Sequence, residues 1–174
     1  ALRGPIEAGR DVVVVEPTDL AMFRRRYRKF LPTAAATALR DATYDVMEYV
    51  GHLLDEGAEA GALRAGDGQA VAYHSHCQQR TLDLEAPTVE VLEALGYDVE
   101  TSSTECCGMA GSFGYKSEYY ELSMEVGGQL REQFADAAAD GHVVAASGTS
   151  CQEQLEALVG GPVRHPVQLI APEA

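Results

Sequence analysis

Basic residues are scarce in this chain, and lysine is almost absent. The 174 residues include 13 Lys and Arg against 27 Asp and Glu, which gives a formal net charge of −14. The only lysines are Lys29 and Lys116. Phosphate contacts need a basic surface, so this balance argues against nucleic acid as a partner. An acidic, lysine-poor and alanine-rich surface instead predicts a halophilic protein from a high-salt cytoplasm, although an ordinary acidic protein would share these features.

Long hydrophobic runs and a secretory signal are also missing. No window of the sequence is apolar enough to span a membrane, and no signal peptide is visible. We therefore expect a cytoplasmic protein, and a peripheral position at the inner face of the membrane is compatible with this. The chain begins with Ala1 and not with Met, which we interpret as the start of a fragment of a longer protein.

Four cysteines are present: Cys77, Cys106, Cys107 and Cys151. Adjacent cysteines rarely bond to each other, because the joining peptide strains the geometry of a disulfide, but both can reach one metal cluster. Without a secretory signal, these residues are expected to be reduced ligands and not a disulfide framework. Gly108 follows the pair directly. It permits a positive φ or a close approach of the backbone to whatever the cysteines hold.

Short apolar segments alternate with helical patterns along the chain. We predict strands at residues 11–16, 69–73, 98–101, 141–146 and 162–165. The first strand has the composition of one buried on both faces of a parallel sheet. Asp19 is expected to cap the helix that follows it, and residues 35–56 are predicted to be helical. The pattern predicts an α/β fold with a mostly parallel sheet and helices on both faces, arranged as two pseudo-repeated lobes.

Every cysteine follows a predicted strand. Cys77 comes after the second strand, Cys106 and Cys107 after the third, and Cys151 after the fourth. In a parallel sheet these strand ends lie along one edge, where ligands bind in open α/β folds. The four sulfur atoms are therefore expected to converge.

Two histidines and a long helix accompany the cysteines. His74 and His76 lie just before Cys77, and we expect one of them to neighbour the site. The helix predicted from Lys116 to about Ala139 should point its free N–H groups and the positive end of its dipole at the thiolates. Its glycine pair at 127–128 indicates a close backbone contact. Its predicted buried stripe is Tyr119, Leu122, Val126, Leu130 and Phe134.

The chain contains a short internal echo. Residues 11–20 align with residues 142–151, and both segments are predicted strands that turn through a threonine into a helix. Leu20 takes the place of Cys151. We interpret residues 1–68 as the tail of a degenerate first repeat with a helical connection, and residues 69–174 as a second repeat that carries the cysteine site.

Residues 69–166 resemble the cysteine-rich CCG domain. The positions that carry the resemblance are Cys77, Cys106-Cys107-Gly108, Gly111-x-x-Gly114-Tyr115, Cys151-x-x-Gln154 and His165-Pro166. That domain occurs in heterodisulfide reductase and in the iron–sulfur subunits of anaerobic glycerol-3-phosphate dehydrogenase and of glycolate and lactate oxidases. The chain is particularly similar to the C-terminal iron–sulfur module of fused FAD-linked oxidases, such as D-lactate and D-2-hydroxyglutarate dehydrogenase-like proteins.

The resemblance implies a function in electron transfer. It implies a [4Fe–4S] cluster on four thiolates, with two glycines in the cofactor-binding loop: Cys77, Cys106, Cys107, Cys151, Gly108 and Gly111. The cluster would pass electrons from FAD to an acceptor after oxidation of a small 2-hydroxy acid. This chain has no dinucleotide-binding signature, so FAD is expected in an FAD-binding domain elsewhere in the full-length protein. The family often has Cys-x-x-Cys where this chain has Gly148 and Cys151, so a noncubane cluster with five sulfurs is not expected.

Two alternatives stay open. A closed zinc site could use the same four sulfurs, or three of them with His76 or His74. A metal-free domain could keep its cysteines as remnants or as a thiol/disulfide pair, with one thiol of depressed pKa. Either alternative would make this a structural or partner-docking domain of the same enzyme, and in no case does the sequence identify a catalytic residue.

Overall fold

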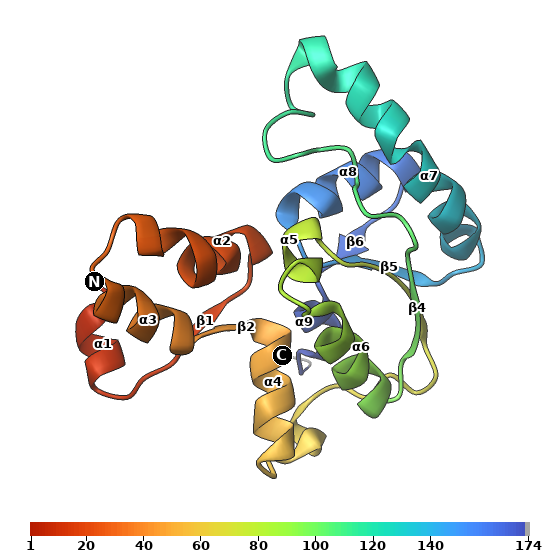
Figure 1. Ribbon diagram of the computed structural model, residues 1–174. Coiled ribbons are helices and arrows are strands. Elements are labelled where there is room, and N and C mark those ends of the chain that lie inside the picture. The colour runs from red at the N-terminus through yellow and green to blue at the C-terminus, as the bar shows by residue number, and fades with distance from the viewer. Residues whose placement is uncertain (173–174) are drawn as a thin grey trace.

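The protein has two lobes of unequal size, connected by helix α4 (Val46–Asp55) (Figure 1). A computed structural model describes residues 1–172. Within these residues every strand pair is parallel, and helices pack around the sheets. The predicted α/β class is therefore confirmed.

The larger lobe is built on a four-stranded sheet with the strand order β4-β3-β5-β6. The strands are β3 (Ala70–His74), β4 (Asp98–Thr101), β5 (Val143–Ala146) and β6 (Val163–Arg164). Each overlaps a predicted strand. The two central strands end together, because His74 pairs with Ala146 in the register of β3 and β5.

Helices cover both faces of this sheet. One face packs against α4, α6 (Glu85–Ala94) and α9 (Pro166–Ile170), and the other packs against α7 (Tyr120–Ala139) and α8 (Thr149–Val159). Successive side chains of a strand point to opposite faces. Accordingly, Val71 and Tyr73 pack on the face covered by α4, α6 and α9. Ala72 packs on the opposite face with Leu130 of α7 and Leu155 of α8.

The smaller lobe has a two-stranded parallel sheet. Its strands are β1 (Val12–Val14) and β2 (Thr43–Asp45), and its helices are α1 (Arg3–Glu7), α2 (Pro17–Ala21), the π-helix η1 (Met22–Arg26), the 3₁₀ turn η2 (Tyr27–Lys29) and α3 (Thr33–Asp41). The segment 57–68 between the lobes is a loop that includes the 3₁₀ turn η3 (Ala60–Ala62). A small core joins Val14 and Leu20 to Leu84 of the larger lobe.

Two expectations for β1 and the helix after it were wrong. The strand is not buried on both faces, because Val13 and Val15 are 42% and 51% exposed. In a parallel sheet the connecting helices cover the faces, and the helices of the smaller lobe leave the side of β1 that carries Val13 open to solvent. Asp19 also does not cap the following helix. Glu16 is the N-cap of α2, and its carboxylate accepts a hydrogen bond from the N–H of Thr18.

Residues 35–56 do not form one continuous helix. Strand β2 interrupts the helical pattern and pairs with β1 in the register Val13 to Tyr44. The hydroxyl of Thr43 donates to the carbonyl of Leu39 and closes the preceding helix (Oγ1–O 2.6 Å). Asp45 then starts α4 with a reciprocal capping box that includes Glu48. Local side-chain bonds of Thr43 and Asp45 therefore override the alanine-rich pattern.

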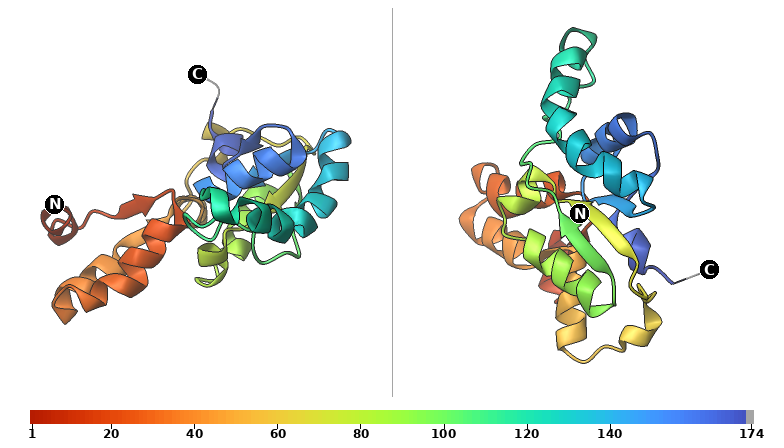
Figure 2. Two further views of the ribbon diagram at one scale, coloured as in Figure 1. Left: turned by 90° about the horizontal axis from the view of Figure 1, so that it is seen from above. Right: turned by 90° about the vertical axis from the view of Figure 1, so that its right-hand side faces the viewer.

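Helix α7 departs from its predicted buried stripe. A 3₁₀ turn, η4 (Ser117–Tyr119), precedes it. Leu130 and Phe134 are buried, but Leu122 and Val126 are 51% and 42% exposed. Figure 1 and the right-hand view of Figure 2 show the reason, since the first turns of α7 project beyond the sheet. Only the second half of the stripe belongs to the core.

The lobes share an order of elements that agrees with the internal echo. In each lobe, helical segments connect two paired parallel strands, and a helix that begins with a capping box follows the second strand. The two series are β1–β2–α4 and β5–β6–α9. Leu20, the counterpart of Cys151, is fully buried in apolar surroundings. The division at residue 68 stays a prediction. Within residues 1–172 no helix has the length and apolar character needed to cross a membrane, and the cytoplasmic location also stays a prediction.

Candidate metal centre

The carboxyl ends of the central strands form the floor of the site. His74 is the last residue of β3, and Cys151 lies in the first turn of α8, which follows β5. Cys77 begins the short helix α5 (Cys77–Arg80), and the loop after β4 carries Cys106 and Cys107. Since β3 lies between β4 and β5, the sheet topology brings these segments to one edge, as predicted.

Three buried side chains come together at this edge. The potential ligand atoms of His74, Cys107 and Cys151 all lie within 4.8 Å of one another. All three residues are buried. Imidazole nitrogen and thiolate sulfur are the donors that zinc and iron–sulfur clusters use. The donor set therefore fits a metal centre.

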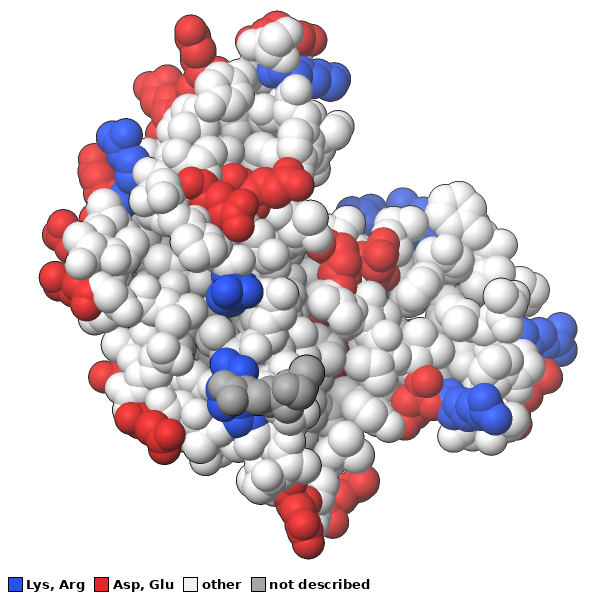
Figure 3. Space-filling view, turned by 180° about the vertical axis from the view of Figure 1, so that it is seen from behind, with Lys and Arg blue, Asp and Glu red and all other residues white. Residues whose placement is uncertain are grey.

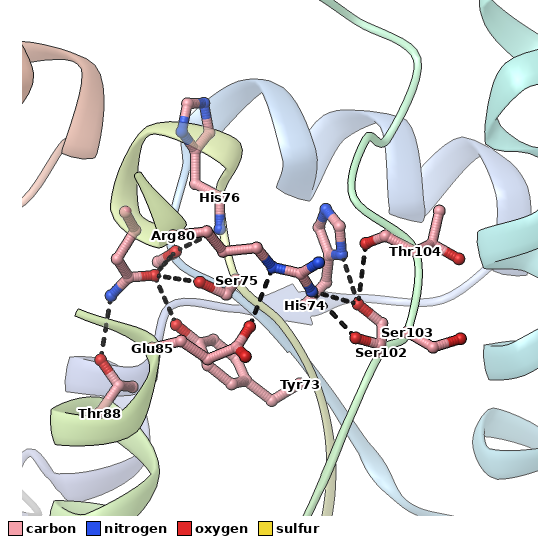
Figure 4. Close-up of polar contacts among 12 residues, drawn as sticks. Tyr73, His74, Ser75, His76, Arg80, Glu85, Thr88, Ser102, Ser103 and Thr104 are labelled. Carbon is pink, nitrogen blue, oxygen red and sulfur yellow. Dashed lines mark hydrogen bonds and ion pairs between the residues drawn. The ribbon is translucent and has the colours of Figure 1, made fainter. Parts of the chain in front are cut away.

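His74 is held in the orientation that a metal ligand needs. Its Nδ1 lies 2.7 Å from Oγ of Ser102, while its Nε2 is buried and has no hydrogen-bond partner (Figure 4). If Nδ1 carries the proton and donates to Ser102, the lone pair of Nε2 is free for a metal. An unpaired buried nitrogen is unfavourable. A metal bound at Nε2 would remove that penalty.

The other predicted ligands are nearby but do not belong to this triad. Cys77 is exposed, and its sulfur lies 3.9 Å from Nδ1 of His76. Cys106 is half-buried, and its sulfur accepts the N–H of Gly108 (3.4 Å). None of the four cysteines takes part in a disulfide. The structure thus gathers two of the predicted cysteines with one histidine, and the four-cysteine ligand set stays a prediction.

His76 caps helix α5 and is held in place by hydrogen bonds. Its backbone N–H donates to Ser147 (3.0 Å), and its Nδ1 accepts the N–H of Gln78 as the cap of α5. Its ring lies against Gly148, where an added Cβ atom would overlap it. Burial lowers the pKa of His76, so the neutral ring is favoured.

The glycines of the loop have different roles. Gly108 has a φ of 99°, and a Cβ atom there would overlap the carbonyl of Ser123 on α7. The hydroxyl of Ser123 donates to the carbonyl of Gly108 (3.0 Å), and Gln154 of α8 donates to the carbonyl of Ser123 (3.0 Å). Gly111 has a φ of 69° but open space around it. Gly108 thus permits helix packing, and Gly111 permits a turn.

The first turn of α7 does not point at the cysteines, so that expectation was wrong. The middle of α7 approaches them, since a Cβ atom at Gly127 would lie 2.9 Å from the carbonyl oxygen of Cys107. Two other helices begin at the site. Cys77 is the first residue of α5, and Cys151 is the third of α8. The positive ends of these helices act in favour of anionic sulfur, but the pKa of each thiol is still raised, that of Cys77 mainly by burial and that of Cys151 by its hydrogen bond with Cys107 and by burial.

The buried sulfurs share a proton in a way that prepares them for a metal. A hydrogen bond from Cys151, opposed by burial and supported by His74 and the N–H of Met109, lowers the pKa of Cys107 to about 4. The same hydrogen bond and burial raise the pKa of Cys151. Cys107 is therefore a thiolate at neutral pH. Thiolates are the form that binds metals.

A buried polar network fixes the floor below His74, and sequence reasoning missed it. Oε1 of Gln79 accepts three hydroxyls, from Tyr73 (2.7 Å), Ser75 (3.0 Å) and Ser147 (2.6 Å). Its amide donates to Thr88 (3.0 Å). Figure 4 shows the hydrogen bonds of Tyr73, Ser75 and Thr88 in this network as dashed lines. The only sequence signal for this network is the position of three members at the ends of predicted strands, namely Tyr73, Ser75 and Ser147.

Ser102 was also missed. Beyond its contact with His74, it accepts hydrogen bonds from Arg80 through both its carbonyl (2.9 Å) and its hydroxyl (3.0 Å) (Figure 4). Arg80 is held in turn by an ion pair with Glu85 (2.9 Å). This chain of contacts connects α5 and α6 to the orientation of the His74 ring.

The geometry agrees with a comparison to known families. Residues 71–156 match the family model described as a cysteine-rich domain, CCG. This segment is a CCG domain. It includes Cys77, the Cys106–Cys107 pair and Cys151, so the candidate metal centre lies wholly inside the family segment.

Relatives of the CCG domain occur in larger proteins. The chain is 30% identical over 102 residues to an anaerobic glycerol-3-phosphate dehydrogenase subunit from Escherichia coli (strain K12), covering 58% of this chain and 25% of that protein. It is 26% identical over 164 residues to D-2-hydroxyglutarate dehydrogenase of the same strain, covering 93% of this chain and 15% of that protein. The chain thus spans a quarter or less of these relatives. No solved structure matches the chain.

Proposed function

We propose that this protein is the electron-transfer module of an FAD-linked oxidoreductase that acts on a small 2-hydroxy acid. The observation that carries the proposal is the meeting of the buried sulfurs of Cys107 and Cys151, with Cys107 a stabilised thiolate, at the sheet edge to which α5 and the loop after β4 also bring Cys77 and Cys106. The relatives support it, because both are named as dehydrogenases or as subunits of one. FAD would be bound by another domain or subunit, since the chain lacks a dinucleotide-binding signature.

The preferred group is a [4Fe–4S] cluster on Cys77, Cys106, Cys107 and Cys151. A bound cluster would supply one-electron transfer. The residues of this chain would provide the binding site and its environment. Cys107 and Cys151 already lie in a buried position that excludes water, and the N–H of Met109 stabilises the thiolate of Cys107. Cys77 and Cys106 would complete the set from the adjoining helix and loop.

A second candidate is a mononuclear zinc site. The mixed triad favours it, because one imidazole nitrogen and two cysteine sulfurs within 4.8 Å match the donors of closed zinc sites. Cys106 could supply the fourth ligand from the adjacent residue of the loop. The module would then be structural, and electrons would not pass through it.

Metal and acid-labile sulfide analysis of protein purified without oxygen tests both candidates. Iron and sulfide in comparable amounts, with visible absorption that bleaches on reduction, are expected for a cluster. That signal should disappear in Cys107→Ser and in Cys77→Ser. Zinc without sulfide, retained in Cys77→Ser but lost in His74→Ala, would select the second candidate. Failure to bind metal even after anaerobic reconstitution would overturn both.

A further inference from the structure

A carboxylate from the smaller lobe joins two helix N-termini across the lobe boundary. Glu16 follows β1 and is half-buried. Its Oε1 accepts the N–H of Thr18 in α2 (3.2 Å), and its Oε2 accepts the N–H of Thr149, the first residue of α8 (3.0 Å). The two threonines occupy matching positions in the internal echo. One side chain therefore caps both helices.

Helix α8 depends on this contact because it has no cap of its own. Its N-cap residue is Gly148, which offers no side-chain acceptor. The first N–H groups of a helix need acceptors, and a side-chain cap commonly supplies one. Here the acceptor comes from Glu16, far away in sequence. Cys151 lies in the same first turn, two residues after Thr149, so the cap holds the segment that presents this sulfur.

Glu16 also brings a negative charge to the metal centre. Burial would raise its pKa, but the N–H groups of Thr149 and Thr18 together with the nearby His76 lower it. The carboxylate is therefore ionised at neutral pH. Its Oε2 lies 3.0 Å from the backbone nitrogen of Thr149, two residues before Cys151, which places the charge beside the turn that carries that sulfur.

The two lobes also meet through contacts that do not involve Glu16. Val14 and Leu20 pack with Leu84 of the larger lobe. A side-chain nitrogen of Arg25 also donates to the carbonyl of Thr81. Loss of the carboxylate should therefore leave the two lobes in contact, and its local effect can be measured in a folded protein.

We propose that Glu16 is a positioning residue through which the smaller lobe fixes the first turn of α8 and lowers the reduction potential of the metal centre. The first half rests on geometry alone, and the second half rests on the proposed function. A negative charge beside the centre stabilises its oxidised, more positive state. Removal of that charge should shift the midpoint potential to more positive values.

Three variants separate position from charge. Glu16→Gln removes the charge and one of the two acceptor oxygens. Glu16→Asp keeps the charge but is too short to reach both amides. Asp19→Asn is the matched control, because it removes a charge from the exposed first turn of α2 without a contact to α8.

The first measurement is amide hydrogen exchange at Thr149 to Cys151 in the metal-free protein. Exchange should become roughly fivefold faster in Glu16→Gln and in Glu16→Asp, as expected for loss of a helix cap. It should not change in Asp19→Asn. Unchanged exchange in folded Glu16→Gln would overturn the positioning role, whether or not the protein binds a metal.

The second measurement is the midpoint potential of the reconstituted protein. It should become more positive in Glu16→Gln and stay close to wild type in Glu16→Asp and Asp19→Asn. Equal shifts in Glu16→Gln and Asp19→Asn would reduce the effect to general surface charge and overturn the electrostatic role. A wild-type protein that takes up no redox centre would refute the proposed function instead, while the exchange result would stand.

Discussion

The ring of His76 occupies the space that a side chain at position 148 would need. A Cβ atom on Gly148 would overlap the imidazole, which is buried and fixed by its bond to the N–H of Gln78. The chain has a glycine and not a cysteine at this position, and the ring of His76 fills the space that the cysteine side chain would take. The bulk of His76 and the absence of a side chain at Gly148 are complementary.

A cysteine introduced at position 148 should clash with His76. We expect Gly148→Cys to lower the free energy of unfolding by about 1–3 kcal/mol, the usual range for overpacking. In a His76→Ala background the same substitution should be nearly neutral. Denaturant unfolding of the two single variants and the double variant measures the coupling. Equal destabilisation in both backgrounds would show that the two positions do not compete for space.

The arrangement of the sheet was predictable because each strand leaves a local signal. The β-branched and alanine-rich segments at 69–73, 98–101 and 141–146 overlap β3, β4 and β5. Strand β2 was missed because its three residues carry almost no periodic pattern. It depends on pairing with β1 and on the capping bonds of Asp45, which only the folded chain provides.

The candidate site was predictable in outline only. The positions of the cysteines after strands indicated that sulfur atoms gather at one edge, and Cys107 and Cys151 do so. The sequence did not reveal that His74 completes a buried triad with these two cysteines. Nor did it reveal Ser102 or Glu16, since the contacts of a serine hydroxyl or a distant carboxylate depend on tertiary packing.

The glycine pair of α7 offers a prediction with an internal control. A Cβ atom at Gly127 would lie 2.9 Å from both the carbonyl oxygen of Cys107 and Cδ1 of Leu158. Gly127→Ala should therefore push the cysteine loop away from α7, weaken metal binding and destabilise the fold by about 1–3 kcal/mol. Chemical denaturation and metal titration check both effects.

Gly128 is the control because no atom lies within 4 Å of an added Cβ. Gly128→Ala should stabilise the protein by about 0.5–1 kcal/mol, since alanine is the better helix former. Metal affinity should not change. Equal effects of the two substitutions would mean that Gly127 does not mark a close contact with the cysteine loop.

The charge of −14 predicts a strong dependence of stability on salt. Acidic side chains are spread over both lobes on the face shown in Figure 3. Simple screening should act mainly below about 0.5 M KCl, because the screening length falls from about 10 Å at 0.1 M to about 3 Å at 1 M. A melting temperature that continues to rise from about 1 M to about 3 M KCl, above the concentrations at which screening acts, is expected for a halophilic protein. A plateau below 1 M would favour an ordinary acidic protein.

Asp45 should make stability fall as pH rises through mildly acidic values. Its Oδ1 accepts the N–H of Met47 (2.9 Å), but its Oδ2 is buried without a partner. Burial raises its pKa from the usual 3.8 to about 6 in the folded protein. Between these values the folded state binds more protons than the unfolded state, so stability decreases with pH by up to about 3 kcal/mol from this group.

Asp45→Asn keeps the cap oxygen but cannot titrate. The free energy of unfolding of wild type minus that of Asp45→Asn, measured with urea, should therefore fall from pH 4 to pH 7 and stay level above it. A difference that is constant over this range would show that Asp45 titrates alike in the folded and unfolded chains.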